Sequence, residues 1–196
     1  MHAWRKLGIN KSLDLTVSFS NVPADRLHTA LLGAAAANML AYDLEQQEKV
    51  NIPISDNIGW LDFTHGVTFS SAVRMQCEKY PELWPAGLLQ IACFIGRNAA
   101  FTEPEPNLAS WRVDDVENFF TKTVAALHDH NCDEFIVSAH LVKTVLAART
   151  EARANDVDEV GEHLAAAINR FLNSPLKRKQ TRRTAHQALK FVSMDG

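Results

Sequence analysis

The chain has few of the residues that break helices. It contains only 8 glycines and 7 prolines in 196 residues, and no stretch repeats with a fixed period. This scarcity argues against a fold built from many tight turns or from tandem repeats, and it favours long helices. The length suits one domain, and an apolar fraction of 46% with a charged fraction of 22% is typical of a globular protein.

The sequence also lacks long apolar runs. No segment reaches the roughly 18 uncharged apolar residues that span a bilayer, and the first residues, MHAWRKLGINKSLD, lack the apolar core of a secretory signal. We therefore expect no membrane partner and a cytoplasmic location. The three cysteines fit this expectation, since Cys77, Cys93 and Cys132 are odd in number and have no metal-ligand spacing.

Familiar catalytic motifs are missing as well. There is no glycine-rich phosphate loop, no nucleophile elbow, no HExxH and no CxxC. These absences leave open whether the protein is an enzyme. The formal net charge of −3 argues against a protein devoted to polyanions.

Hydrophobic periodicity predicts an all-α protein, a single globular domain over residues 1–196 with six or seven helices in a bundle-like arrangement. An irregular segment is expected at residues 1–20, where LDLTVSFS alternates like a strand but has no obvious partner. The helix at 86–101 is apolar nearly all round, which predicts a central position. The predicted helices span residues 23–48, 56–80, 86–101, 113–130, 132–154, 156–173 and a basic segment within 175–196.

The stretch NIGWLDFTHGVTFSS, residues 57–71, places two polar residues among apolar ones. Asp62 and His65 are three apart and so share one face of a helix. Because a buried carboxylate must be paired, bound to a metal or protonated, we expect a hydrogen bond between Asp62 and His65. The pair could equally be a structural one that locks the packing.

Two further histidines lie on apolar helix faces. His28 follows Asp25 at the same spacing of three, as in bundles that hold two metal ions, although the usual residue is Glu and the additional glutamates of such sites are not evident. His140 borders an apolar stripe and has Lys143 one turn later. If these helices meet, His28, His65, His140 and Asp62 would suit a divalent metal ion or a haem, and Asp62, His65 and His140 could perform acid–base catalysis.

The leading functional hypothesis is therefore a helical protein whose buried Asp/His site binds a metal, a cofactor or a small molecule, with an oxidoreductase as one candidate. The alternative is a non-catalytic interaction or oligomerisation module, in which the helix at 86–101 could form a homo-oligomer interface. Its basic C-terminal helix would contact an acidic protein partner or nucleic acid. Nucleic acid is the less expected, because no recognition-helix pattern or aromatic interleaving is present. The basic residues are Lys177, Arg178, Lys179, Arg182 and Arg183.

Overall fold

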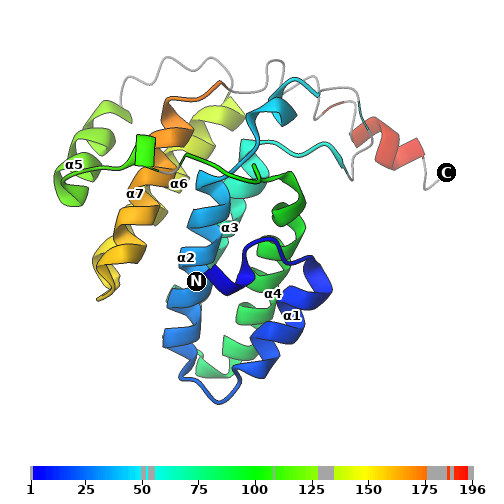
Figure 1. Ribbon diagram of the computed structural model, residues 1–196, viewed down its shortest axis with the longest axis vertical. Coiled ribbons are helices and arrows are strands. Elements are labelled where there is room, and N and C mark those ends of the chain that lie inside the picture. Colours follow the sequence, from blue (N-terminus) through cyan, green and yellow to red (C-terminus); the bar gives the residue numbers. More distant parts are fainter. Residues whose placement is uncertain are drawn as a thin grey trace.

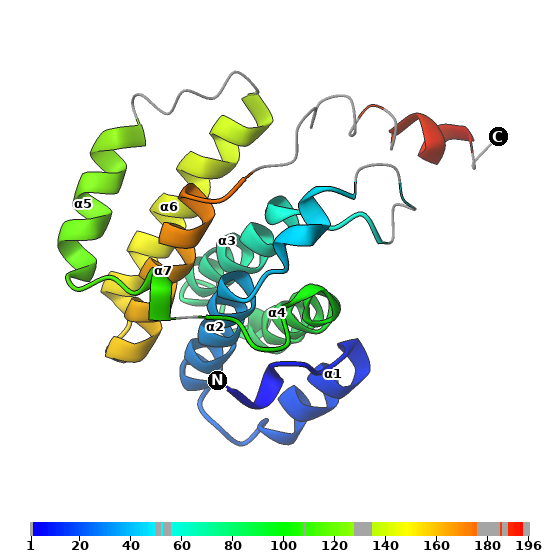
Figure 2. The ribbon, with the colours of Figure 1, turned by 45° about the horizontal axis from the view of Figure 1, so that its top comes forward.

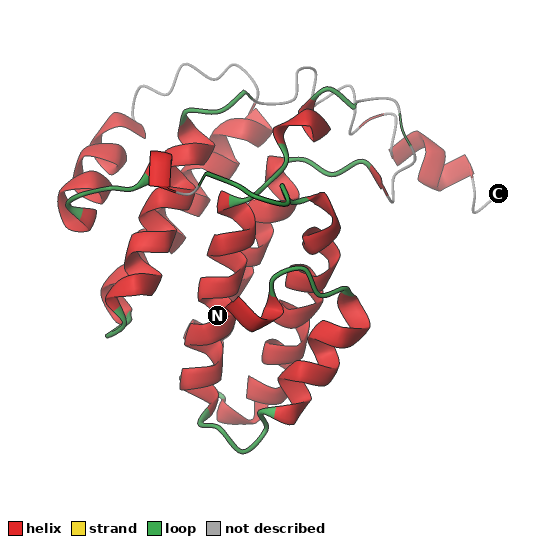
Figure 3. Cartoon of the chain, in the orientation of Figure 1, coloured by secondary structure: helices red, strands yellow, loops and turns green. Residues whose placement is uncertain are grey.

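The computed structural model describes residues 2–49, 52, 56–107, 109–127, 135–175, 185 and 188–193. Within these ranges every regular element is a helix, and the only β-type pairing is an isolated bridge between Tyr42 and Thr102 (Figure 3). The prediction of a single all-α domain is thus confirmed. The α-helices are α1 (Ile9–Ser18), α2 (Ala24–Leu40), α3 (Trp60–Cys77), α4 (Trp84–Asn98), α5 (Val116–Ala126), α6 (Phe135–Ala154) and α7 (Asp158–Leu172). Short 3-10 helices cover His2–Trp4, Leu44–Gln47, Pro81–Leu83, Ala99–Phe101 and Ala109–Trp111.

Helix α2 occupies the centre of the bundle and packs against α3, α4 and α7 (Figure 1). All of its residues from Leu31 to Leu40 are buried. The small side chains of Gly33–Ala37 let the neighbouring helices approach closely. The sequence predicted a central position for the helix at 86–101, and that helix also packs against three others, α1, α2 and α3. The corresponding helix, α4, buries one face and leaves the other partly exposed.

Two apolar clusters share α2. One gathers around Trp60 and Phe171 and takes Leu32 from α2. The other lies between α2 and α4, around Ile91, and takes Leu31 from α2. Adjacent residues of one helix therefore serve two cores, which explains why α2 carries no polar stripe along its middle.

Helix α2 ends at Leu40, earlier than the predicted 23–48 helix. Donors from other parts of the chain bind the last carbonyl groups of the helix. The buried guanidinium of Arg170 donates to the Leu40 carbonyl, and the Glu103 amide donates to the Ala41 carbonyl at 2.8 Å. The last carbonyls of a helix lack partners within it, so these donors stabilise the end. A second Arg170 nitrogen binds the Glu103 carboxylate, which ties α7 to the same point.

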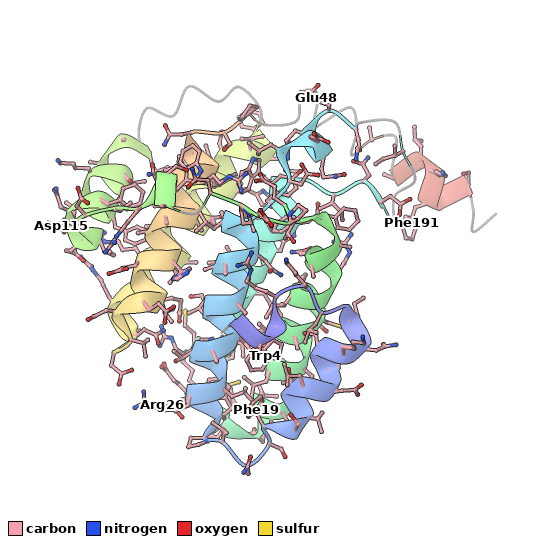
Figure 4. The ribbon with its side chains drawn as sticks, in the orientation of Figure 1. Trp4, Phe19, Arg26, Glu48, Asp115 and Phe191 are labelled. Atoms are coloured by element: carbon pink, nitrogen blue, oxygen red, sulfur yellow. The ribbon has the colours of Figure 1, made fainter. Side chains whose placement is uncertain are left out.

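The N-terminal segment is not irregular as predicted, because residues 9–18 form α1. This helix packs along α4 (Figure 2). Its buried face carries Ser12, whose hydroxyl donates to the Ala92 carbonyl at 2.9 Å, and Thr16, which accepts from the Trp4 indole at 3.0 Å. Trp4 in turn lies beside Phe19, with ring centroids 5.7 Å apart (Figure 4). The alternation of LDLTVSFS was misleading because the fully buried residues of this helix are Ser12 and Thr16, while Leu13 and Leu15 are only partly buried against the core.

The other predicted helices have counterparts with slightly different ends. Helix α3 runs without interruption through Gly66, where a kink was considered. Residues 188–193 are helical and lie to the side of the bundle, and Leu189, Phe191 and Val192 are exposed by 70%, 62% and 73% (Figure 4). The basic residues Lys177, Arg178, Lys179, Arg182 and Arg183 lie outside the described residues, so the contact with an acidic partner stays a prediction.

None of the helices in the described ranges combines the length and the apolar character that a membrane span requires.

The contact between α1 and α4 depends on Gly96, which gives a first prediction. A Cβ atom at this position would lie 2.6 Å from the Ile9 Cα atom and 2.8 Å from the Ile9 nitrogen. Gly96→Ala should therefore lower the free energy of unfolding by about 1–3 kcal/mol, measured by urea denaturation.

The matched control is Gly161→Ala in α7, where the nearest atoms, in Ala152, are 3.9 Å from the new Cβ. This variant should be as stable as the parent or more stable by about 0.4–1 kcal/mol, because alanine restricts the unfolded chain. Equal stability of the two variants would show that the close approach of α1 is not required.

Candidate functional site

His65 and His140 meet across the interface between α3 and α6. Their Nε2 atoms are 3.1 Å apart, and the ring centroids are 5.2 Å apart with the planes tilted by 56°. Each histidine lies in the second turn of its helix. The two helices run in the same direction, since a second contact joins Arg74 of α3 to Glu151 of α6, further along both. Both imidazoles are half-buried.

The hydrogen bonds of His140 define the tautomers of the pair. Its Nδ1 atom lies 2.6 Å from the Ile136 carbonyl oxygen. Because a carbonyl can only accept, Nδ1 carries the proton and Nε2 of the neutral ring is an acceptor. His65 must then donate from its own Nε2. Both rings are therefore neutral, and the Nε2–H group of His65 donates to the Nε2 lone pair of His140.

The surroundings favour these neutral rings. Burial lowers the pKa of His65, the charge of Lys143 and the neighbouring His140 lower it further, and Asp62 opposes the change. Burial likewise lowers the pKa of His140, with a smaller contribution from Lys143. The pKa of Lys143 is itself lowered by burial. Burial, reinforced by the charge of Lys143, thus makes protonation of either imidazole unfavourable.

Asp62 lies near the pair, but its carboxylate has other partners. One oxygen accepts from the Arg97 guanidinium at 3.0 Å and the other accepts from the Gly59 amide at 2.9 Å. The second contact closes the first turn of α3, as an acidic residue at the N-terminus of a helix often does. The hydrogen bond expected between Asp62 and His65 is therefore replaced by an ion pair that joins α3 to α4.

His28 belongs to a separate region of the α2–α3 interface. It is only 2% exposed, and its Nε2 lies 2.9 Å from the carbonyl oxygen of Ser70, five residues beyond His65. Its ring also meets the Trp84 ring, with centroids 5.6 Å apart. Burial lowers its pKa. The structure thus brings together His65 and His140 and leaves His28 out of their site.

A buried ion pair was not found from the sequence. Glu151 is completely buried, and its carboxylate accepts from Arg74 at 2.9 Å and from the Ser71 hydroxyl at 2.8 Å. It lies on the same face of α6 as His140 and Thr144, since it follows them by eleven and seven residues. That spacing in the sequence was the available signal, since a carboxylate in line with two other polar residues predicts a polar seam between helices.

The metal sites expected from the sequence differ from what the described residues bring together. Among the described residues, no three or more His, Cys, Asp or Glu side chains form a group that could hold a metal ion. The four-residue set of His28, His65, His140 and Asp62 and the two-metal site that included Asp25 are therefore not assembled. What remains is a pair of imidazoles.

The thiols and cavities lie elsewhere. Cys77 is buried and its pKa is raised, Cys93 is half-buried, and Cys132 lies outside the described residues. A cavity of about 190 Å³ is lined mostly by apolar residues, among them Trp84 and Leu88, and a polar one of about 360 Å³ lies beside Glu117 and Arg153. Neither is lined by His65 or His140, which are half-buried at the α3–α6 interface.

Comparison with protein-family models found no matching family, and searches of curated proteins and of solved structures found no similar protein.

The lowered pKa values of the two histidines predict how stability depends on pH. The unfolded chain takes up protons near the ordinary histidine pKa of about 6.5, before the folded pair does. The contribution of the pair is therefore fully present above that pH and is lost as the pH falls toward the lower folded-state pKa values. The free energy of unfolding should decrease between about pH 7.5 and pH 5, and the decrease should be smaller in the double variant His65→Gln/His140→Gln.

The matched control is His163→Gln in α7. His163 makes the same type of contact as His140, from Nδ1 to the carbonyl four residues earlier, here Glu159 at 2.7 Å. This variant should follow the parent curve. Denaturation at several pH values checks both, and identical slopes for the double variant and the parent would contradict the prediction.

Proposed function

We propose that the protein binds one divalent transition-metal ion between Nε2 of His65 and Nε2 of His140. The supporting observation is their separation of 3.1 Å. Two metal–nitrogen bonds of about 2.0–2.1 Å, at an angle between 90° and the tetrahedral value, separate the nitrogens by about 2.8–3.4 Å. The pair is thus spaced like neighbouring ligands of one ion.

The protonation of the pair also supports metal binding. A histidine ligand must be neutral, and its second nitrogen usually donates to a carbonyl or carboxylate that orients the ring. His140 already has this arrangement through Ile136. For His65, binding requires only that the proton on Nε2 move to Nδ1. The metal would take the position of the proton between the two rings.

The number of protein ligands points to a reactive centre. Two imidazoles would leave more open positions for water and substrate than the three protein ligands of catalytic zinc sites do. Imidazole suits zinc, copper, iron and nickel, so the chemistry could be hydrolytic or, with a redox-active metal, that of an oxidoreductase. The same spacing argues against a haem held between the two rings, because ligands on opposite sides of iron would lie about 4 Å apart, twice a bond of about 2 Å.

The test is cobalt binding by the untagged protein. The parent should bind one Co²⁺ ion per chain, followed by its visible absorption and by elemental analysis after dialysis. His65→Ala and His140→Ala should each weaken the affinity at least tenfold, because one imidazole alone cannot chelate the ion.

His163→Ala is the control, because it removes a histidine from α7 and should bind as the parent does. Circular dichroism of each variant identifies any that fail to fold, and His65→Gln and His140→Gln then replace them. Unchanged cobalt affinity in folded variants of both residues would refute the proposed function.

A further inference from the structure

The charges around the histidine pair are unfavourable for a bare cation. Arg97 is neutralised by Asp62, whose oxygen lies 3.0 Å from the guanidinium. In the part of the chain that the structure describes, no ion pair involves Lys143. Its charge acts on both His65 and His140. A divalent ion between the two rings would therefore be repelled by an uncompensated ammonium group.

A negatively charged ligand would remove this repulsion. We propose that the site takes an organic monocarboxylate, whose carboxylate group lies between the metal ion and Lys143. One carboxylate oxygen replaces a water molecule on the metal, and the ammonium group of Lys143 binds the carboxylate. No electrons are transferred, and the displaced water leaves to solvent. The inference rests on the proposed metal site.

The position of Lys143 fits this role. It follows His140 by three residues and so lies one turn further along α6, at the exposed edge of the α3–α6 interface. A flexible lysine side chain can follow a ligand that differs in exact position. A single unpaired cation matches the single charge of a carboxylate better than the two charges of a phosphate. The amide groups of both helices are already used within the helices at these positions, so they add no donors for a phosphate.

The neighbouring surface suits an apolar ligand body. Phe69 lies one turn beyond His65 on α3, and its ring meets that of Phe94 from α4, with centroids 5.4 Å apart. Both side chains are half-buried, and Ala72 beside them is exposed. An aromatic or aliphatic group attached to the carboxylate could cover these rings. We therefore choose benzoate as the probe.

The experiment is a titration of the cobalt-loaded protein with benzoate, followed by the change in the visible cobalt spectrum. The parent should bind benzoate, and Lys143→Met should weaken benzoate binding at least tenfold. Lys143→Met should retain cobalt at least as well as the parent, because a positive charge has been removed. Lys143→Arg should keep benzoate binding, and Lys122→Met on the exposed side of α5 is the control for loss of a surface lysine.

The outcomes separate the two proposals. If cobalt binds but benzoate binds equally well to Lys143→Met, or does not bind the parent, the carboxylate inference is overturned and the metal site stands. If inorganic phosphate binds more tightly than benzoate and depends on Lys143, the assignment to a carboxylate is wrong. If cobalt does not bind, the metal-free protein is titrated with benzoate by calorimetry. Binding that depends on Lys143 then supports an anion site without metal, and its absence overturns the inference.

Discussion

The buried carboxylate of Glu151 determines how α3 and α6 lie against each other. It is excluded from solvent, and among the described residues its hydrogen-bond donors are Arg74 and Ser71 of the facing helix. Removing one partner of such a pair leaves an uncompensated charge in the core, which costs several kcal/mol, about 3–5 in typical cases. Sliding one helix along the other would have the same effect. Because both helices are rigid, this one contact also determines that His65 faces His140 three turns away.

The polar seam between α3 and α6 differs in charge balance from one end to the other. At the buried end, Arg74 is neutralised by Glu151 and Glu78. At the exposed end, Lys143 has no carboxylate partner in the described residues, and the two imidazoles stay neutral. The first end is suited to holding helices together. The second leaves the positive charge of Lys143 unmatched, while the Nε2 lone pair of His140 accepts from His65.

The sequence predicted the positions of the helices better than the side-chain contacts between them. Apolar periodicity located the six helices from α2 to α7, since burial of one face dominates their stability. Helix α1 was missed because its inward face carries Ser12 and Thr16, whose hydrogen bonds depend on another helix. Among the site residues, the costly position of His65 was recognised. The partner of Asp62 was not, because Arg97 is 35 residues away and only the packing of α4 brings it near.

The histidine pair also joins two points that are 75 residues apart along the chain. Between them the chain forms α4 and α5, so the pair is a long-range contact that only the folded bundle brings together. Closing a loop of this length carries a large entropic cost in the unfolded chain. An ion held by both rings would act as a reversible cross-link that favours the folded over the unfolded chain. Occupancy of the site would then be coupled to the cooperative folding of the whole domain rather than to the local order of two helices.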